Sequence, residues 1–161
     1  MGLEIERRFL VVNDMWRNQA AGSRKIVQGY LAVGEDGIAV RIRLQEDASV
    51  LTVKAPGDGL SRPEFEYEVP VEDAEQLLVL CGRRVVRKTR HQVPLDGLTW
   101  EIDVFEGANE GLVLAECELD RPDRPLVLPP WVGREVTRDH RYSNAQLSLR
   151  PWPQWAASNR E

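Results

Sequence analysis

The chain has 161 residues, of which 42% are hydrophobic and 29% charged, and its formal net charge at pH 7 is −5. A chain of this length and balance is expected to fold into one domain with a sizeable core, which excludes a chain that is disordered as a whole. The acidic balance disfavours nucleic acid and anionic membranes as partners, and no apolar run approaches the roughly 18 residues of a membrane span.

The predicted elements are mostly strands. The first strand is EIERRF (4–9), and a short helical turn capped by Asp14 is expected to follow at 14–18. Seven further stretches alternate polar with apolar residues or are rich in β-branched and aromatic residues, and they cover 25–33, 38–45, 50–55, 64–69, 84–93, 98–105 and 112–119. Apolar residues at helical spacing predict helices over 71–81 and 139–150.

The breaks between the strands are rich in turn residues, as in GEDG (34–37) and PLDG (94–97). Strands joined mainly by such hairpins predict a mainly β (α+β) fold, in which an antiparallel sheet closes into a barrel. Residues 1–150 are expected to form a single domain. The Pro-broken segment 151–161 is expected to be an extended tail that packs its tryptophans and then frays.

Nearly every strand is charged on one face and apolar on the other. The charged faces carry Glu4, Glu6, Arg8, Arg41, Arg43, Lys54, Glu64, Glu66, Lys88, Arg90, Glu101, Asp103, Glu116 and Glu118. In an ordinary barrel these faces would be solvated, around an apolar core. In the alternative they line a wide lumen, and the apolar faces pack outward against the helices and tail. Because each strand tends to carry charges of one sign, we favour the lumen.

The side chains of this set are eight acids and six bases. Arginine and lysine suit phosphate oxygens, and clustered carboxylates suit Mg²⁺ or Mn²⁺, which take oxygen ligands. Together they predict a site for a polyanion that carries its own divalent metal.

The motif EIERRF resembles the ExExK signature of the CYTH superfamily, the triphosphate tunnel metalloenzymes. The resemblance continues in the family's order over about residues 3–150, through QGYL (28–31), VRIR (40–43), LTVKAPG (51–57), RPEFEYEV (62–69), RKTRHQV (87–93), WEIDVFEGANEGLVLAECEL (100–119) and WVGREVTRDHRYSNAQL (131–147). The chain is most similar to the small bacterial single-domain branch, which looks like inorganic triphosphatases. The resemblance implies an eight-stranded antiparallel barrel whose charged tunnel binds triphosphate and divalent metal.

The resemblance also implies roles for single residues. The expected ligands of Mg²⁺ or Mn²⁺ are Glu4, Glu6, Glu64, Glu66, Glu101, Asp103, Glu116 and Glu118. The expected phosphate-binding residues are Arg8, Arg41, Arg43, Lys54, Lys88, Arg90 and Arg141, of which Arg8 and Lys54 are also the expected catalytic residues. Arg141 and Tyr142 match a stretch that closes one tunnel mouth.

Arg8 replaces the lysine of the signature. A lysine there could lose its proton and help to activate water, whereas arginine stays protonated. Arg8 therefore leaves binding better supported than turnover. Resemblance to the small bacterial branch nevertheless implies a metal-dependent triphosphatase whose substrate is inorganic tripolyphosphate. A thiamine triphosphatase or adenylyl cyclase of the same superfamily stays open. So does a non-catalytic binder of triphosphate, polyphosphate or nucleotide.

The remaining features concern compartment. The N-terminus carries acids where a signal peptide needs a basic and then an apolar stretch. Cys81 and Cys117 lack the spacing of a metal or redox site and are expected to be buried free thiols. We therefore expect a cytoplasmic protein whose partner is a small triphosphate-containing molecule. The sequence leaves a monomer and a homodimer open.

Overall fold

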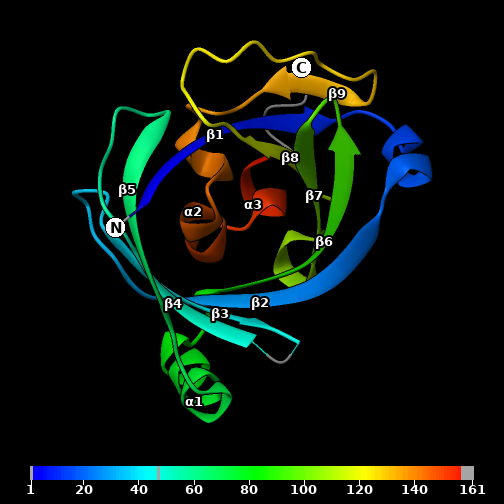
Figure 1. Ribbon diagram of the computed structural model, residues 1–161. Coiled ribbons are helices and arrows are strands. Elements are labelled where there is room, and N and C mark those ends of the chain that lie inside the picture. The colour runs from blue at the N-terminus through cyan, green and yellow to red at the C-terminus, as the bar shows by residue number, and fades with distance from the viewer. Residues whose placement is uncertain (1, 47, 157–161) are drawn as a thin grey trace.

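The computed structural model describes residues 2–46 and 48–156. Its strands are β1 (Gly2–Val11), β2 (Gly22–Val33), β3 (Ala39–Gln45), β4 (Ala48–Lys54), β5 (Ser61–Glu68), β6 (Val85–Leu95), β7 (Leu98–Glu106), β8 (Val113–Glu118) and β9 (Val132–Glu135). Neighbours in the sheet follow the order β5-β4-β3-β2-β6-β7-β8-β1, and pairing of β5 with β1 closes the ring. The predicted antiparallel barrel of eight strands is confirmed (Figure 1).

Short turns set the register of the barrel. The β6–β7 hairpin pairs Leu95 with Leu98 across Asp96 and Gly97, which both have positive φ, at 51° and 75°. This conformation matches the twist of the flanking strands and is the one that an Asp-Gly pair favours. The ninth strand, β9, was not predicted and pairs with β1 outside the ring.

The helices differ more from the predictions. Helix α1 (Val71–Cys81) has the predicted bounds and packs its apolar side on the outer face of β2, β3 and β4 (Figure 1). The predicted helix over 139–150 is instead the 3₁₀ turn η3 (His140–Tyr142) followed by α2 (Asn144–Leu149). The break falls at Ser143, which has extended dihedrals and caps α2, because its Oγ accepts a hydrogen bond from the N–H of Gln146.

Two other expectations are wrong. The segment after residue 150 is not extended, since Trp152–Ala156 forms α3, with Pro153 in the first turn where a proline costs no helical hydrogen bond. The predicted fraying lies outside the described residues. The turn near residue 14 is the 3₁₀ helix η1 (Met15–Gln19), but the Asp14 side chain does not cap it; the carbonyl of the Asn13 side chain accepts from the N–H of Met15 instead.

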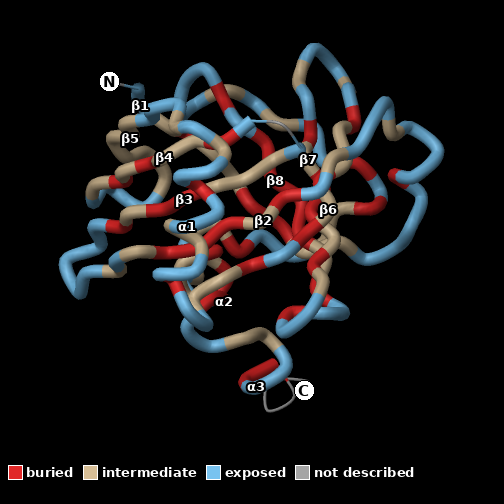
Figure 2. Tube along the Cα trace, turned by 90° about the horizontal axis from the view of Figure 1, so that it is seen from below, coloured by how far each residue is buried: buried red, intermediate tan, exposed pale blue. Residues whose placement is uncertain are grey.

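The core has an outer and an inner part. An outer cluster lies between the barrel wall, η1 and the segment before β9, and includes Phe9, Trp16, Trp100 and Trp131. The inner cluster joins wall residues such as Leu114 and Phe105 to Leu147 of α2 and Trp155 of α3. Helices α2 and α3 therefore plug one end of the barrel, as Figures 1 and 2 show, rather than covering its outside as expected. Among the described helices, none is long and apolar enough to cross a membrane.

Candidate functional site

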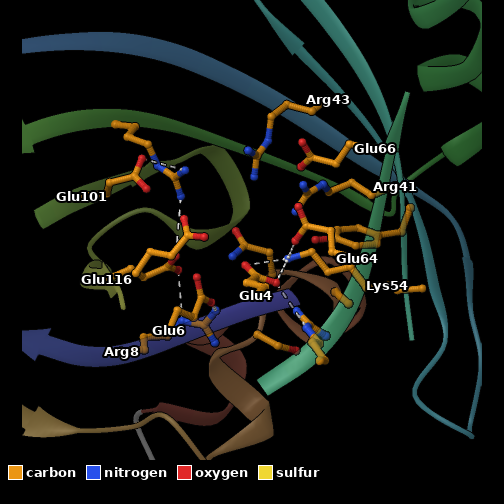
Figure 3. Close-up of a pocket in the computed structure, with 18 of the residues that line it drawn as sticks. Glu4, Glu6, Arg8, Arg41, Arg43, Lys54, Glu64, Glu66, Glu101 and Glu116 are labelled. Carbon is orange, nitrogen blue, oxygen red and sulfur yellow. Dashed lines mark hydrogen bonds and ion pairs between the residues drawn. The ribbon is translucent and has the colours of Figure 1, made fainter. Parts of the chain in front are cut away.

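Beside the plug, the barrel encloses a charged cavity of about 220 Å³ (Figure 3). Its wall carries seven carboxylates and seven cations, namely Glu4, Glu6, Glu64, Glu66, Glu101, Glu116, Glu118, Arg8, Arg24, Arg41, Arg43, Lys54, Arg62 and Arg90. The period-two pattern produces this lining: Glu4, Glu6 and Arg8 face inward from β1, while Ile5 and Phe9 of the same strand join the outer cluster. The charged strand faces thus line a lumen.

Three expected side chains lie elsewhere. Lys88 and Asp103 face the barrel interior but are fully buried beneath the cavity wall and do not line the cavity. Arg141 is also outside the cavity: it is half exposed, pairs with Asp139 at 2.7 Å and stacks on Trp155. Its neighbour Tyr142 is buried in the plug.

Three lining residues were not predicted from the sequence: Arg24, Tyr30 and Arg62. Arg62 shares the alternation phase of Glu64 and Glu66, so the same pattern predicts that it faces inward. Arg24 and Tyr30 share one face of β2 and were missed because β2 carries no pair of like charges there. Arg24 and Arg62 line the cavity, whereas Lys88 and Asp103 do not. The lining therefore has equal numbers of acids and bases, not the expected excess of acids.

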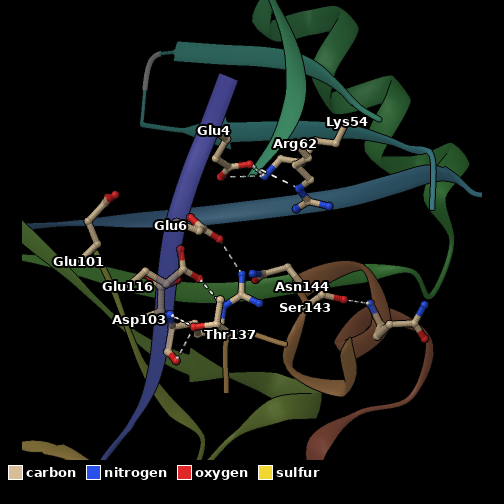
Figure 4. A network of polar contacts seen from close by, with 12 residues as sticks. Glu4, Glu6, Lys54, Arg62, Glu101, Asp103, Glu116, Thr137, Ser143 and Asn144 are labelled. Carbon is tan, nitrogen blue, oxygen red and sulfur yellow. Dashed lines mark hydrogen bonds and ion pairs between the residues drawn. The ribbon is translucent and has the colours of Figure 1, made fainter. Parts of the chain in front are cut away.

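One group of ion pairs gathers around Lys54. The Nζ of Lys54 lies 2.9 Å from Glu4, and Arg62 lies 3.5 Å from the same carboxylate (Figure 4). Glu64 lies 3.6 Å from the Nζ of Lys54. Burial opposes ionisation of Glu4, but Lys54 outweighs it and holds the pKa of Glu4 well below its usual range. Burial and hydrogen bonding to Glu66 and Glu4 raise the pKa of Glu64 to about 8.

A second group gathers around Arg8 and Arg90. Arg8 pairs with Glu6 at 2.9 Å and with Glu116 at 3.1 Å, and Arg90 pairs with Glu101 at 3.0 Å and with Glu116 at 3.7 Å. Despite its burial, Glu116 has a pKa well below the usual range because Arg8 and Arg90 stabilise its charge. Burial and the nearby charges of Glu116 and Glu4 raise the pKa of Glu6 to about 8.

Asp103 holds Arg90 in place from below. The Nε and Nη2 of Arg90 donate to the two carboxylate oxygens of Asp103 at 2.8 and 3.0 Å. Lys88 donates to the same carboxylate at 2.7 Å and to the side-chain carbonyl of Asn144 on α2 at 3.0 Å. This buried network ties the plug to a cation of the cavity wall.

Arg41 and Arg43 are held differently. Arg41 donates to the hydroxyl of Thr52 at 3.3 Å, and Arg43 donates to the side-chain carbonyl of Gln28 at 3.0 Å. Among the described residues, neither arginine forms an ion pair, and the buried Nε of Arg41 has no hydrogen-bond partner. Burial and the charges of Arg41 and Arg90 lower the pKa of Arg43 to about 9, so it stays cationic at pH 7.

The carboxylates of the cavity fit a divalent metal by their chemistry. They are oxygen donors, as Mg²⁺ and Mn²⁺ prefer, and burial beside other carboxylates raises the pKa of Glu6, Glu64 and Glu118, which a bound cation would reverse. Within the described residues, however, no three acidic, histidine or cysteine side chains are already grouped as a metal site. Glu4 forms an ion pair with Lys54, and Glu116 forms one with Arg8. These two carboxylates would have to release their cations before they could bind a metal.

Comparison with known proteins places the chain among similar sequences and structures. A family model described as the CYTH domain matches residues 2–150. An inorganic triphosphatase of Acetivibrio thermocellus is 44% identical over 94% of this chain and 97% of its own length, and one of Nitrosomonas europaea is 40% identical over 91% and 97%. A solved structure of an inorganic triphosphatase superposes with a TM-score of 0.67 at 36% identity, covering 92% of this chain and 96% of that one.

Proposed function

The chain belongs to the CYTH domain family, and we propose that it hydrolyses inorganic tripolyphosphate to pyrophosphate and phosphate with Mg²⁺ or Mn²⁺. The observation that carries the proposal is the cavity itself, in which two arginines that form no ion pair with any described carboxylate, Arg41 and Arg43, share the lining with seven carboxylates. Cations that are not neutralised by the protein are suited to a polyanion, and the carboxylates are suited to its metal.

Binding is expected to exchange ion pairs across the cavity. Phosphate oxygens would first meet Arg41 and Arg43, since these need not give up a carboxylate. Arg8, Lys54 and Arg90 would then bind phosphate in place of their present acidic partners. The carboxylates released in this way, with Glu4, Glu6, Glu64, Glu66, Glu101, Glu116 and Glu118 as candidates, would hold the metal. We retain Asp103 as a more remote candidate, because both its oxygens are bound by Arg90 and Lys88.

Hydrolysis requires a water oxygen to bond to a terminal phosphorus while the bond from that phosphorus to its bridging oxygen breaks. Pyrophosphate leaves with the electron pair, and the proton of the water passes to a carboxylate of the cavity or to solvent. A bound metal supplies charge neutralisation and a more acidic water in such sites. Lys54 and Arg8 are expected to stabilise the charge that builds on the phosphate oxygens.

Arg8 cannot accept the proton from water. Burial opposes its charge, but Glu116 and Glu6 outweigh burial and raise the pKa of Arg8 above its ordinary value. It therefore stays protonated at every working pH, and its role is restricted to binding and orientation. This is why a binder without turnover is the second candidate function.

The compartment proposal rests on the cysteines. Cys81 and Cys117 are buried and free, as predicted, and burial raises the pKa of both thiols. Buried free thiols are usual in reducing compartments, which supports a cytoplasmic location.

The proposed activity is tested by phosphate release. We expect the protein with Mg²⁺ or Mn²⁺ to release phosphate from tripolyphosphate faster than from ATP or thiamine triphosphate. Removing metal with EDTA should stop release and weaken tripolyphosphate binding at least tenfold, because a cavity with equal numbers of acids and bases cannot neutralise several added negative charges.

Three results would contradict this assignment. Cyclic AMP and pyrophosphate formed from ATP would indicate a cyclase. Faster hydrolysis of thiamine triphosphate than of tripolyphosphate would change the substrate. Tight, metal-strengthened binding of tripolyphosphate without phosphate release would indicate the binder.

A substitution at position 8 distinguishes phosphate binding from proton transfer as the role of this residue. We expect Arg8→Lys to bind tripolyphosphate within about threefold of the parent, since it keeps the charge and loses only the guanidinium geometry. If hydrolysis does not depend on a neutral amine at position 8, turnover should be no faster in the variant than in the parent. The measurement is a pH–rate profile of both proteins. A faster variant with a new alkaline rise in rate would show that the amine activates water.

A further inference from the structure

The cations of the cavity fall into two classes by what holds them. Five of them each pair with at least one carboxylate, so part of their charge is already neutralised: Arg8, Arg24, Lys54, Arg62 and Arg90. Within residues 2–46 and 48–156, Arg41 and Arg43 instead donate hydrogen bonds to neutral oxygens, from Thr52 and Gln28, and form no ion pair. The second class is the one whose charge is fully available to a ligand.

Gln28 is placed to hold Arg43 in one orientation. It lies on β2 directly opposite Arg43 of β3 and is 0% exposed. Its Oε1 accepts from the Nε of Arg43 at 3.0 Å, and its Nε2 donates to the hydroxyl oxygen of Tyr30 at 3.1 Å. Because one end of the amide faces a donor and the other an acceptor, neither the amide nor Arg43 can turn without losing a buried hydrogen bond.

We propose that Gln28 is a positioning residue for polyphosphate binding, whose neutral amide fixes the guanidinium of Arg43 without neutralising it. The inference rests on the proposed function only in taking a polyphosphate as the ligand. A carboxylate at the same place would also orient Arg43, but the ligand would then have to displace it. The amide thus gives orientation and leaves the charge to the ligand.

The surroundings of Arg43 support this distinction. Burial lowers its pKa most and the charges of Arg41 and Arg90 lower it further, so the folded protein holds a cation whose charge its own residues compensate only in part. Asp103 attracts it to a smaller extent, and Glu66 on β5 interacts with both Arg41 and Arg43 without forming an ion pair with either. An uncompensated buried cation costs stability, and a bound phosphate removes that cost.

The decisive variant is Gln28→Glu, which keeps the size of the side chain and an acceptor for Arg43 and adds one negative charge. We expect its Kd for tripolyphosphate in EDTA, measured by titration calorimetry, to rise at least tenfold. With metal, KM should rise at least tenfold while kcat changes less than threefold. Its melting temperature should not fall, since the new carboxylate pairs with Arg43. The control is Gln154→Glu, the same charge change on the exposed side of α3, with parent-like values expected.

A second variant, Gln28→Met, keeps the neutral charge but cannot hold Arg43. Its affinity should fall, but less than that of Gln28→Glu, because Arg43 keeps its charge and loses only its orientation. If Gln28→Glu does not fold, Gln28→Met decides alone, and a parent-like Kd overturns the inference. So does parent-like binding by Gln28→Glu, or a loss of melting temperature in both variants with unchanged affinity, which would indicate packing only.

The test of Gln28 can fail or succeed independently of the test of the proposed hydrolysis. A parent that binds tripolyphosphate but releases no phosphate would end the proposed hydrolysis and leave the role of Gln28 to be decided by the Kd values. A parent that binds no tripolyphosphate, with or without metal, would overturn both.

Discussion

Replacing both Arg41 and Arg43 with methionine is expected to lower kcat/KM for tripolyphosphate by roughly 10²- to 10⁴-fold. A hydrogen bond to a charged group contributes about 1.5–3 kcal/mol, and each arginine offers such bonds to the ligand without first releasing a carboxylate. The loss should appear mostly in KM, and in the Kd measured without metal. Steady-state kinetics and titration calorimetry of the double variant test this.

The same double variant should be no less stable than the parent. The pKa of Arg43 is lower in the folded protein than in the unfolded chain, so the folded state binds this proton less tightly. The charge of Arg43 therefore lowers the free energy of unfolding, by its full amount at every pH below about 9. Removing the charge at pH 7 therefore removes a cost, and the melting temperature should stay level or rise. Arg83→Met with Arg87→Met makes the same charge change on the exposed surface. An equal loss of kcat/KM in that control would show that general charge, not this pair, attracts the substrate.

The sequence allowed the charged lumen to be predicted because the signal is local. Glu4, Glu6 and Arg8 follow one another at a spacing of two, and a strand places such residues on one face whatever the rest of the fold does. The same reasoning placed Arg41 and Arg43, whose strand β3 begins within one residue of its predicted start. The choice of the inside over the outside depended on the repeated pairing of like charges.

The alternation pattern does not predict how far along the barrel axis an inward-facing side chain lies. Lys88 and Asp103 have the correct phase and do face inward, but α2 docks at their level and seals them beneath the cavity. Which end a helix plugs depends on contacts between residues far apart in the chain, such as that of Lys88 with Asn144. Strand β9 was missed for the same reason, since it is four residues long and is held by pairing with β1.

The neutral residues of the site were missed for a different reason. Gln28 and Thr52 have the inward phase, but reasoning from charge overlooks uncharged side chains. Unlike the carboxylate partners of Arg8 and Arg90, they hold an arginine without adding a negative charge that compensates it. The distinction between a cation that is free to bind a ligand and one that is already neutralised can be read only from the contacts.

Asp103→Ala is expected to lower the free energy of unfolding by about 3–5 kcal/mol, because it removes the carboxylate that pairs two buried cations. Among the described residues, Lys88 would keep the carbonyl of Asn144 and the ring of Phe105 but no carboxylate, and Arg90 would keep its ion pairs with Glu101 and Glu116. Denaturant unfolding of the parent and the variant measures this loss. In the fraction that remains folded, Arg90 is no longer fixed from below, so kcat/KM for tripolyphosphate should also fall at least tenfold.

The pair Lys88→Met with Asp103→Leu separates buried charge from packing. Removing both partners leaves no lysine charge to compensate, so much of the stability lost in Asp103→Ala should return. The activity should not return with it, because Arg90 still lacks the two hydrogen bonds from its guanidinium to Asp103. Stability that is equally low in the single and double variants would show that Asp103 acts by filling space. Full activity in the double variant would show that Arg90 is positioned by Glu101 and Glu116 alone.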